Sequence, residues 1–359
     1  MGDQYPKFKA AAVQTSPVFL DREATVKKTC QLIQEAADNG ANLVAFPEVF
    51  VAGYPYWIWL DSPRKHDQHF LRLFKEAVEI PGPATDELCR AAKAAGVYLV
   101  IGVNEKEPLN MGTMWNTNII ISREGTILGK HRKLVPTFAE KMIWSRGDGS
   151  GMRVWNTDIG RLGTLACGEN SNTLARFALL AQGEQVHVAN YPEIGGIGQN
   201  TWIHLRAGAH SCEGKVFTVV STSTIGQDIV DLLGDTEEKR EYLTSGKAYS
   251  AIFGPNGELL TSIEGEEGII YADIDIEQEI IRKQFHDIIG HYNRFDVLSL
   301  NLNMDEDQPM KLVGGQPGSP GSGSATMEQM ERLLEQTRTE QKELRETLDR
   351  ISRRLDVEQ

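Results

Sequence analysis

The stretch RLGTLACGENSNTLARFALLAQ, residues 161–182, holds a strand, a tight turn and a helix in direct succession. Its first part, RLGTLAC, is short and apolar and predicts a buried strand, whereas TLARFALLAQ (residues 173–182) has apolar residues at helical spacing. A second apolar run, QVHVANY (residues 185–191), follows the helix. Strands that alternate with helices in this way are typical of the α/β class.

The same alternation extends through the upstream part of the chain. Near-continuous apolar runs indicate sheets that are covered on both faces. We predict helices at residues 26–37, 86–95 and 202–212, and hairpin turns at SREG (122–125) and GPNG (254–257). The other predicted strands are FKAAAVQ (8–14), NLVAFPE (42–48), VYLVIGVN (97–104), TNIIIS (117–122), VFTVVSTS (216–223), AYSAIFG (248–254) and GIIYADIDI (268–276).

Composition excludes several classes of function. The chain has 359 residues, 40% hydrophobic and 24% charged, as in ordinary globular proteins, and its net charge of −13 disfavours binding to nucleic acid. It contains neither an apolar run long enough for a membrane span nor an N-terminal secretory signal, so we expect a cytoplasmic protein without membrane contact. The four cysteines are far apart, and no histidine spacing suits a metal, so we expect no metal or cofactor.

The composition changes near residue 314. GGQPGSPGSGS (residues 314–324) predicts a flexible linker, and residues 325–359 carry apolar positions at heptad spacing. Thr337 and Gln341 interrupt that seam, so the tail is either a coiled-coil or groove-binding helix or a solvated helix with a weak apolar stripe. We therefore divide the chain into a domain at 1–313, a linker at 314–324 and a helical tail at 325–359.

Cys167 is the candidate nucleophile. It lies between the predicted strand and helix, where backbone N–H groups can lower a thiol pKa and bind a developing negative charge. Gly168 is expected to permit the tight turn. The competing interpretation is a structural cysteine at a strand end, and we expect Cys30, Cys89 and Cys212 to lie in the core.

Two further residues suit the same chemistry. Glu48 ends a predicted strand among apolar neighbours, which should raise its pKa and suit it to proton transfer, unless it is simply solvated. Lys133 is followed by apolar residues, so its ammonium could point inward, although a basic surface patch is the alternative. Glu140 falls on a helix-like stretch, where a solvated helix face is the competing interpretation. A nucleophile, a base and a cation near strand ends indicate cysteine-dependent hydrolysis of C–N bonds.

The motifs resemble those of the nitrilase branch of the carbon–nitrogen hydrolase superfamily, over about residues 7–303. The resemblance rests on AAVQTSPV, LVAFPEVFVAGYPYW, HRKLVPTFAEKMIW with GDGSG, RLGTLACGEN, EQVHVANYP and GHYNRFDVLSLNLN. It implies a catalytic Glu48, Lys133 and Cys167, with Glu140 holding Lys133 in place. It also implies a four-layer αββα sandwich that dimerises through its helical layer and can form spirals or filaments.

The resemblance implies hydrolysis of a nitrile with two waters to a carboxylic acid and ammonia, through a thioimidate and a thioester on Cys167. Gly168 stands where many nitrilases have a Trp, which implies a wider pocket. An aromatic lining would suit arylacetonitriles or aliphatic nitriles. The alternatives are an amidase or cyanide-hydrolysing member of the superfamily, or a filament-forming scaffold. The predicted substrate-binding residues are Gly168, Tyr54, Trp57, Trp144 and Tyr191.

Overall fold

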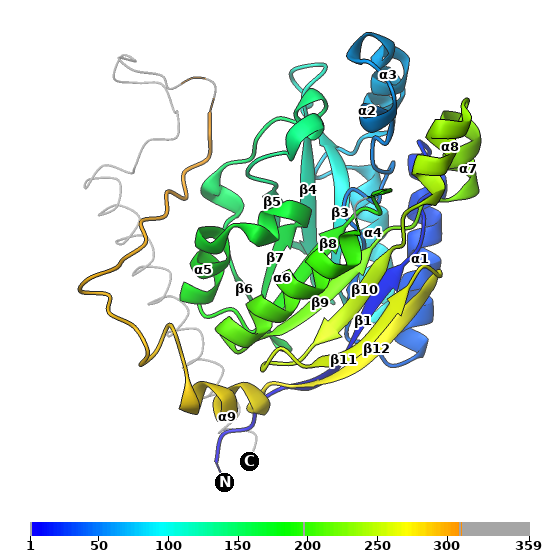
Figure 1. Ribbon diagram of the computed structural model, residues 1–359. Coiled ribbons are helices and arrows are strands. Elements are labelled where there is room, and N and C mark those ends of the chain that lie inside the picture. The colour runs from blue at the N-terminus through cyan, green and yellow to red at the C-terminus, as the bar shows by residue number, and fades with distance from the viewer. Residues whose placement is uncertain (1, 197, 309, 311–359) are drawn as a thin grey trace, which may run out of the picture. The chain divides into compact units, whose positions relative to one another are not determined.

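Two six-stranded sheets form the centre of the structure, a computed structural model that describes residues 2–196, 198–308 and 310 (Figure 1). The first has the order β12-β1-β2-β3-β4-β5, with bounds Gly268–Asp275, Lys7–Gln14, Leu43–Ala45, Tyr98–Lys106, Met114–Ile121 and Ile127–Arg132. The second has the order β11-β10-β9-β8-β7-β6, with bounds Leu259–Glu264, Tyr249–Phe253, Phe217–Thr222, Val186–Tyr191, Gly160–Ala166 and Trp155–Thr157. The predicted linker at 314–324 and tail at 325–359 lie outside the described residues.

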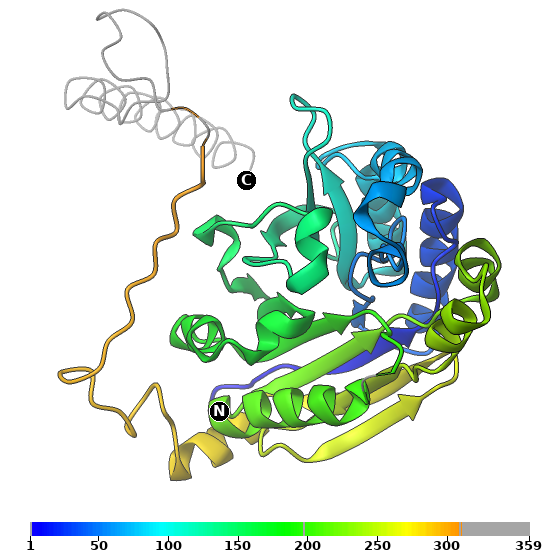
Figure 2. The ribbon, with the colours of Figure 1, turned by 45° about the horizontal axis from the view of Figure 1, so that its top comes forward.

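Helices cover the outer face of each sheet. Helices α1 (Arg22–Asp38) and α4 (Pro83–Ala95) pack on the first sheet, and α5 (Thr173–Ala181) and α6 (Gln199–Gly214) pack on the second (Figures 1 and 2). The result is the predicted αββα sandwich, and it confirms the α/β class. The remaining helices are α2 (Trp57–Leu60), α3 (Asp67–Glu76), α7 (Gln227–Leu233), α8 (Glu237–Thr244) and α9 (Glu277–Phe285).

The alternation of side chains along each strand builds three apolar layers. In β8, Val186 and Val188 face the other sheet, while Ala189 and Tyr191 face the helical layer. Because both faces of such strands are buried, their sequences read as nearly continuous apolar runs. The strands and hairpin turns predicted from those runs are all present.

A polar link crosses the interface between the sheets. The Asn118 side chain donates to Thr164 Oγ1 at 2.8 Å, and the Asn190 side chain donates to Asn118 Oδ1 at 2.6 Å. All three residues are buried, so losing one partner would leave another polar group unpaired. This link fixes how β4 of one sheet lies against β7 and β8 of the other.

Strand direction gathers the candidate residues at one end of the sandwich. Strands β2 and β3 are parallel, and β5 runs the same way because each of β3 and β5 is antiparallel to β4. Glu48 and Lys133 therefore follow strands that end at the same edge. Cys167 directly follows β7, which is parallel to β8 in the facing sheet.

Two local interpretations are wrong. The stretch around Glu140 forms a short 3₁₀ helix, Phe138–Met142, rather than an exposed α-helix, and Glu140 is buried. Cys212 is exposed on α6 instead of lying in the core. Among the described residues, no helix combines the length and apolar character that a membrane crossing requires.

Leu162 tests the layer between the sheets. It is fully buried there, so Leu162→Ala should lower the free energy of unfolding by about 2–5 kcal/mol in urea titrations. Leu259→Ala, at a position 44% exposed on the edge strand β11, should change it by less than about 0.5 kcal/mol. Equal losses at both positions would contradict this placement of the core.

Candidate active site

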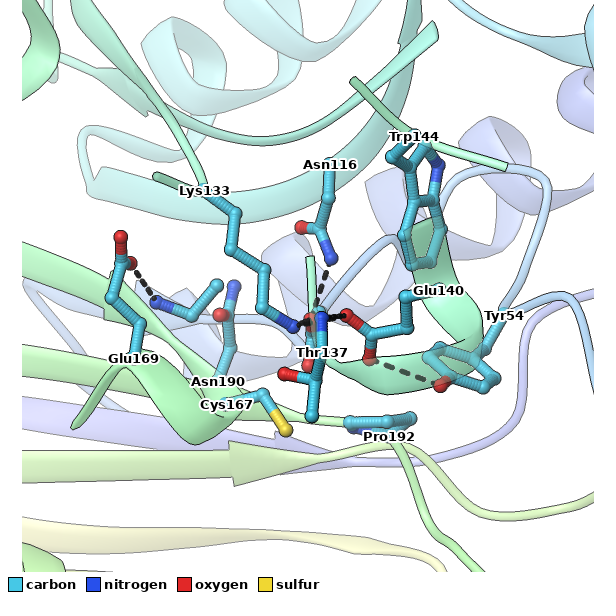
Figure 3. A network of polar contacts seen from close by, with 12 residues as sticks. Tyr54, Asn116, Lys133, Thr137, Glu140, Trp144, Cys167, Glu169, Asn190 and Pro192 are labelled. Carbon is cyan, nitrogen blue, oxygen red and sulfur yellow. Dashed lines mark hydrogen bonds and ion pairs between the residues drawn. The ribbon is translucent and has the colours of Figure 1, made fainter. Parts of the chain in front are cut away.

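The four residues predicted to be catalytic meet in one buried cluster (Figure 3). A carboxylate oxygen of Glu48, one of Glu140 and the Sγ of Cys167 lie within 4.8 Å of one another. Lys133 Nζ lies between the carboxylates and donates to Glu48 Oε1 at 2.9 Å and to Glu140 Oε2 at 2.7 Å. The prediction that the Lys133 ammonium points inward is confirmed, since its side chain is fully buried.

Glu48 is held by the loop that follows β2. Val49 has a left-handed backbone with φ of 41°, which a β-branched residue rarely adopts. The buried Asn104 amide holds this loop by donating to the carbonyls of Val51 and Gly53 at 3.1 and 2.9 Å. Packing thus fixes a strained loop so that Glu48 turns into the interior.

Asn116 sets the positions of both Lys133 and Glu48. Its carbonyl accepts from the Lys133 backbone N–H at 2.8 Å, and its side chain donates to Glu48 Oε1 at 2.6 Å. Our sequence analysis missed this residue. The available signal was a pair of amides, Asn116 and Asn118, on one face of an otherwise apolar strand.

Glu140 accepts hydrogen bonds at both carboxylate oxygens. The backbone N–H of Thr137 donates to Oε2 at 2.7 Å as part of a capping box, and Tyr54 OH donates to Oε1 at 3.0 Å. Trp59 Nε1 in turn donates to Tyr54 OH at 3.2 Å. These contacts leave Glu140 a fixed partner for Lys133.

The turn that carries Cys167 is strained at the nucleophile itself. Cys167 has φ of 48°, in the left-handed region, so the expectation that Gly168 supplies the unusual backbone is wrong. Glu169 braces the turn by accepting from the backbone N–H groups of Ala166 at 3.0 Å and Leu134 at 2.9 Å. Because Leu134 follows Lys133, this carboxylate ties the nucleophile's turn to the loop that carries the ammonium.

His131 has a structural, hydrogen-bonded role. Its Nε2 lies 2.8 Å from Glu169 Oε2. Burial disfavours a charge on this ring, but Glu169 outweighs it and raises the pKa of His131. The ring is therefore part of the brace behind the site.

Burial and neighbouring charges set the protonation of the cluster. Burial raises the pKa of the Cys167 thiol well above its usual range, and Glu48 adds to the rise, while Lys133 and the Gly168 backbone N–H oppose it. The Gly168 N–H thus lowers this pKa as expected, but burial outweighs it. Burial also raises the pKa of Glu48 to about 7, against the opposing charge of Lys133. Burial disfavours the Lys133 ammonium, but the two carboxylates raise its pKa well above the usual value.

The predicted pocket residues lie in different surroundings. Trp144 packs edge-on against Tyr54 with ring centroids 5.7 Å apart, next to Glu140 (Figure 3). Tyr191 shares a buried cluster with Cys167. Trp57 instead packs on Phe19 and His69, so its contact with a substrate stays a prediction.

Gly168 lies close to Thr137. A Cβ at this position would lie 3.1 Å from Thr137 Oγ1, so a larger residue would crowd the space beside Cys167. In Figure 3 the Cys167 sulfur points between Thr137 and Pro192.

A buried thiol, two carboxylates and an ammonium in one cluster are the groups that cysteine-dependent hydrolysis uses. A family model described as carbon–nitrogen hydrolase matches residues 9–280. A nitrilase from Bacillus sp. (strain OxB-1) is 41% identical over 86% of this chain and 92% of its own, and an aliphatic nitrilase from Rhodococcus rhodochrous is 37% identical over 85% of each. The chain belongs to the carbon–nitrogen hydrolase family and, within it, to the nitrilase branch.

Solved structures agree with the fold. The carbon–nitrogen hydrolase from Helicobacter pylori G27 is 20% identical, with a TM-score of 0.65 over 81% of this chain and 97% of its own. At that identity the likeness concerns the arrangement of sheets and helices alone.

The pKa of Glu48 predicts the pH dependence of catalysis. Because only the ionised carboxylate can accept a proton, kcat/KM should fall as pH drops through about 7. The hydrogen bond from Asn116 lowers the pKa of Glu48. Asn116→Ala should therefore move this acidic limb of the kcat/KM profile to higher pH. Asn156→Ala, at an exposed position on β6, should leave it in place. A limb that moves to lower pH in Asn116→Ala would contradict the assignment.

Proposed function

We propose that the protein is a nitrilase that converts an organic nitrile and two waters to a carboxylic acid and ammonia. The observation that carries this proposal is the Lys133 ammonium fixed between two buried carboxylates, both within 4.8 Å of the Cys167 sulfur. The nitrilases at 37–41% identity support the same reaction. In this proposal Cys167 is the nucleophile, Glu48 transfers protons and Lys133 stabilises developing charge.

The first step forms a covalent bond between Cys167 and the nitrile carbon. Since the thiol pKa is raised, the proton must leave Sγ as the S–C bond forms. Glu48 Oε2 is buried without a hydrogen-bond partner among the described residues, so it is free to accept that proton and pass it to the nitrile nitrogen. One π bond of the C≡N group is lost, and the product is a thioimidate.

The later steps release ammonia and then the acid. Water adds to the thioimidate carbon with Glu48 as base, and the protonated nitrogen leaves as ammonia, which gives a thioester. A second water releases the carboxylic acid and restores the thiol. Two of the three Lys133 N–H groups bind Glu48 and Glu140, so the third can stabilise the tetrahedral intermediates together with the Gly168 backbone N–H.

The Lys133 ammonium also bears on the prediction that no metal takes part. It lies between the carboxylates of Glu48 and Glu140, in the place that a cation bound by those oxygens would occupy. Charge neutralisation at this site is therefore supplied by the chain itself.

Aromatic groups around the site support an arylacetonitrile or a medium aliphatic nitrile as substrate. Phe138, 79% exposed, stacks on Trp59 with ring centroids 5.9 Å apart. Trp59 in turn donates a hydrogen bond to Tyr54, which lies beside Glu140. The small Gly168 leaves space on the side of Thr137. A stacked aromatic pair with one exposed member suits a flat, apolar substrate group.

Assembly and location belong to the same proposal. We propose a homodimer formed through the helical layer, because α5 and α6 expose Leu174, Trp202 and Leu205 at 46–63%. Growth into spirals or filaments would depend on further contacts. A cytoplasmic location is supported by the four free thiols.

A panel of nitriles and amides tests the reaction. We expect purified protein to release ammonia and acid from phenylacetonitrile or medium aliphatic nitriles faster than from the matching amides, with products measured by chromatography. Cys167→Ala should remove this activity, whereas Cys212→Ala, at an exposed position, should keep it. Faster turnover of amides than of nitriles would favour an amidase and overturn the proposal.

A further inference from the structure

A second polar cluster lies buried behind the nucleophile. It comprises Asn170, in the 3₁₀ helix Cys167–Ser171; Glu184, in the loop after α5; His187, on β8; and His210, on α6. All four are at most 3% exposed. The chemical steps described above use none of these side chains.

Hydrogen bonds join the cluster into one chain that ends at the nucleophile. Glu184 Oε2 lies 2.8 Å from His210 Nε2, and Glu184 Oε1 lies 2.7 Å from His187 Nδ1. His187 Nε2 lies 2.8 Å from Asn170 Oδ1. The Asn170 amide then donates to the carbonyls of Leu165 and Cys167, each at 3.1 Å.

The partners fix the orientation of Asn170 and the charge of His187. Two carbonyls face the same atom of Asn170, which must therefore be the donating nitrogen, so Oδ1 faces His187. His187 then meets an acceptor at each ring nitrogen, Asn170 Oδ1 and a Glu184 oxygen. Only an imidazolium donates to both.

Glu184 and His210 complete the charge balance of the cluster around His187. Burial would raise the pKa of Glu184, but the two histidines lower it to about 2, so it is an anion. Burial and the charge of His187 lower the pKa of His210 to about 4, with Arg176 of α5 acting in the same sense and Glu184 opposing. His210 is therefore a neutral donor to Glu184, and the cluster has no net charge. Because the ring nitrogens facing Glu184 carry protons, they are not available to a metal ion.

The backbone conformation of Cys167 indicates the role of this chain of hydrogen bonds. A cysteine at φ of 48° is strained and stays there only if its surroundings hold it. In this conformation Sγ lies within 4.8 Å of a carboxylate oxygen of Glu48 and of Glu140. The hydrogen bond from Asn170 to the Cys167 carbonyl opposes relaxation of this turn, in addition to the bonds that Glu169 accepts.

Gly163 on β7 leaves the space that the Glu184 carboxylate occupies. A Cβ at this position would collide with the Glu184 carboxylate, so that carboxylate lies directly against the strand that leads to Cys167. The cluster thus rests on the same strand as the nucleophile.

We propose that Asn170 and His187 are positioning residues, and that the chain from His210 through Glu184, His187 and Asn170 holds Cys167 in its strained, reactive conformation. The imidazolium polarises the Asn170 amide and strengthens its bond to the Cys167 carbonyl. This inference builds on the proposed nitrilase function.

Alkylation of Cys167 by iodoacetamide, followed by peptide mapping, tests the proposal without a nitrile. Asn170→Ala and His187→Ala should slow it about 10- to 100-fold, because a shift of the turn moves Sγ away from Lys133 and the Gly168 N–H. His187→Gln keeps an N–H for Asn170 and should restore part of the rate. Cys212, exposed in the same sample, serves as the reference thiol.

Ser211→Ala is the matched control, because Ser211 neighbours His210 on α6 and donates a buried hydrogen bond to Thr218 instead. It should leave the rate at Cys167 within about twofold. In nitrile assays the Asn170 and His187 variants should lower kcat by similar factors and leave KM nearly unchanged.

The proposal is overturned if folded Asn170→Ala or His187→Ala proteins alkylate Cys167 at the wild-type rate, or if Ser211→Ala slows it equally. A wild-type protein that hydrolyses no nitrile would defeat the proposed function alone, since the comparison of alkylation rates still decides the positioning role.

Discussion

One ammonium held between two buried carboxylates dominates the physics of this site. Taking the charges of Lys133, Glu48 and Glu140 out of water costs several kcal/mol each, so the cluster persists only because every charge has a close partner. Removing Lys133 would leave two buried carboxylates without a cation. The loops and strands around the site are best understood as the means by which these three groups are kept together.

The need to keep these charged groups together explains why polar contacts link the two sheets. Glu48 and Lys133 follow strands of one sheet, and Cys167 follows a strand of the other, so the reacting groups meet only if the sheets keep a fixed relation. Asn118 and Asn190 provide a polar link between the sheets, and Glu169 links the turn of Cys167 to the residue after Lys133. Strain at Val49 and Cys167 is carried by this surrounding structure.

The sequence was sufficient for the strands and for the convergence of Glu48, Lys133 and Cys167, because apolar periodicity and position after a strand are local signals. The four-layer sandwich was implied by the resemblance of the motifs to the nitrilase branch. It did not give the direction of the Cys167 pKa, which depends on burial and on a carboxylate distant in the chain. Asn116 and His187 were missed for the same reason. Their importance lies in partners from other elements, and an amide or imidazole within an apolar run does not identify those partners.

The most direct measurement is a crystal structure of the unmodified protein, flash-cooled after soaking with a slowly hydrolysed nitrile. Because the S–C bond forms before either water reacts, we expect a trapped thioimidate, with a bond from the Cys167 sulfur to the former nitrile carbon. Its nitrogen should lie within hydrogen-bond distance of Lys133 Nζ or the Gly168 N–H. A nitrile bound away from the sulfur, or an adduct on Cys212 with Cys167 unmodified, would contradict the assignment.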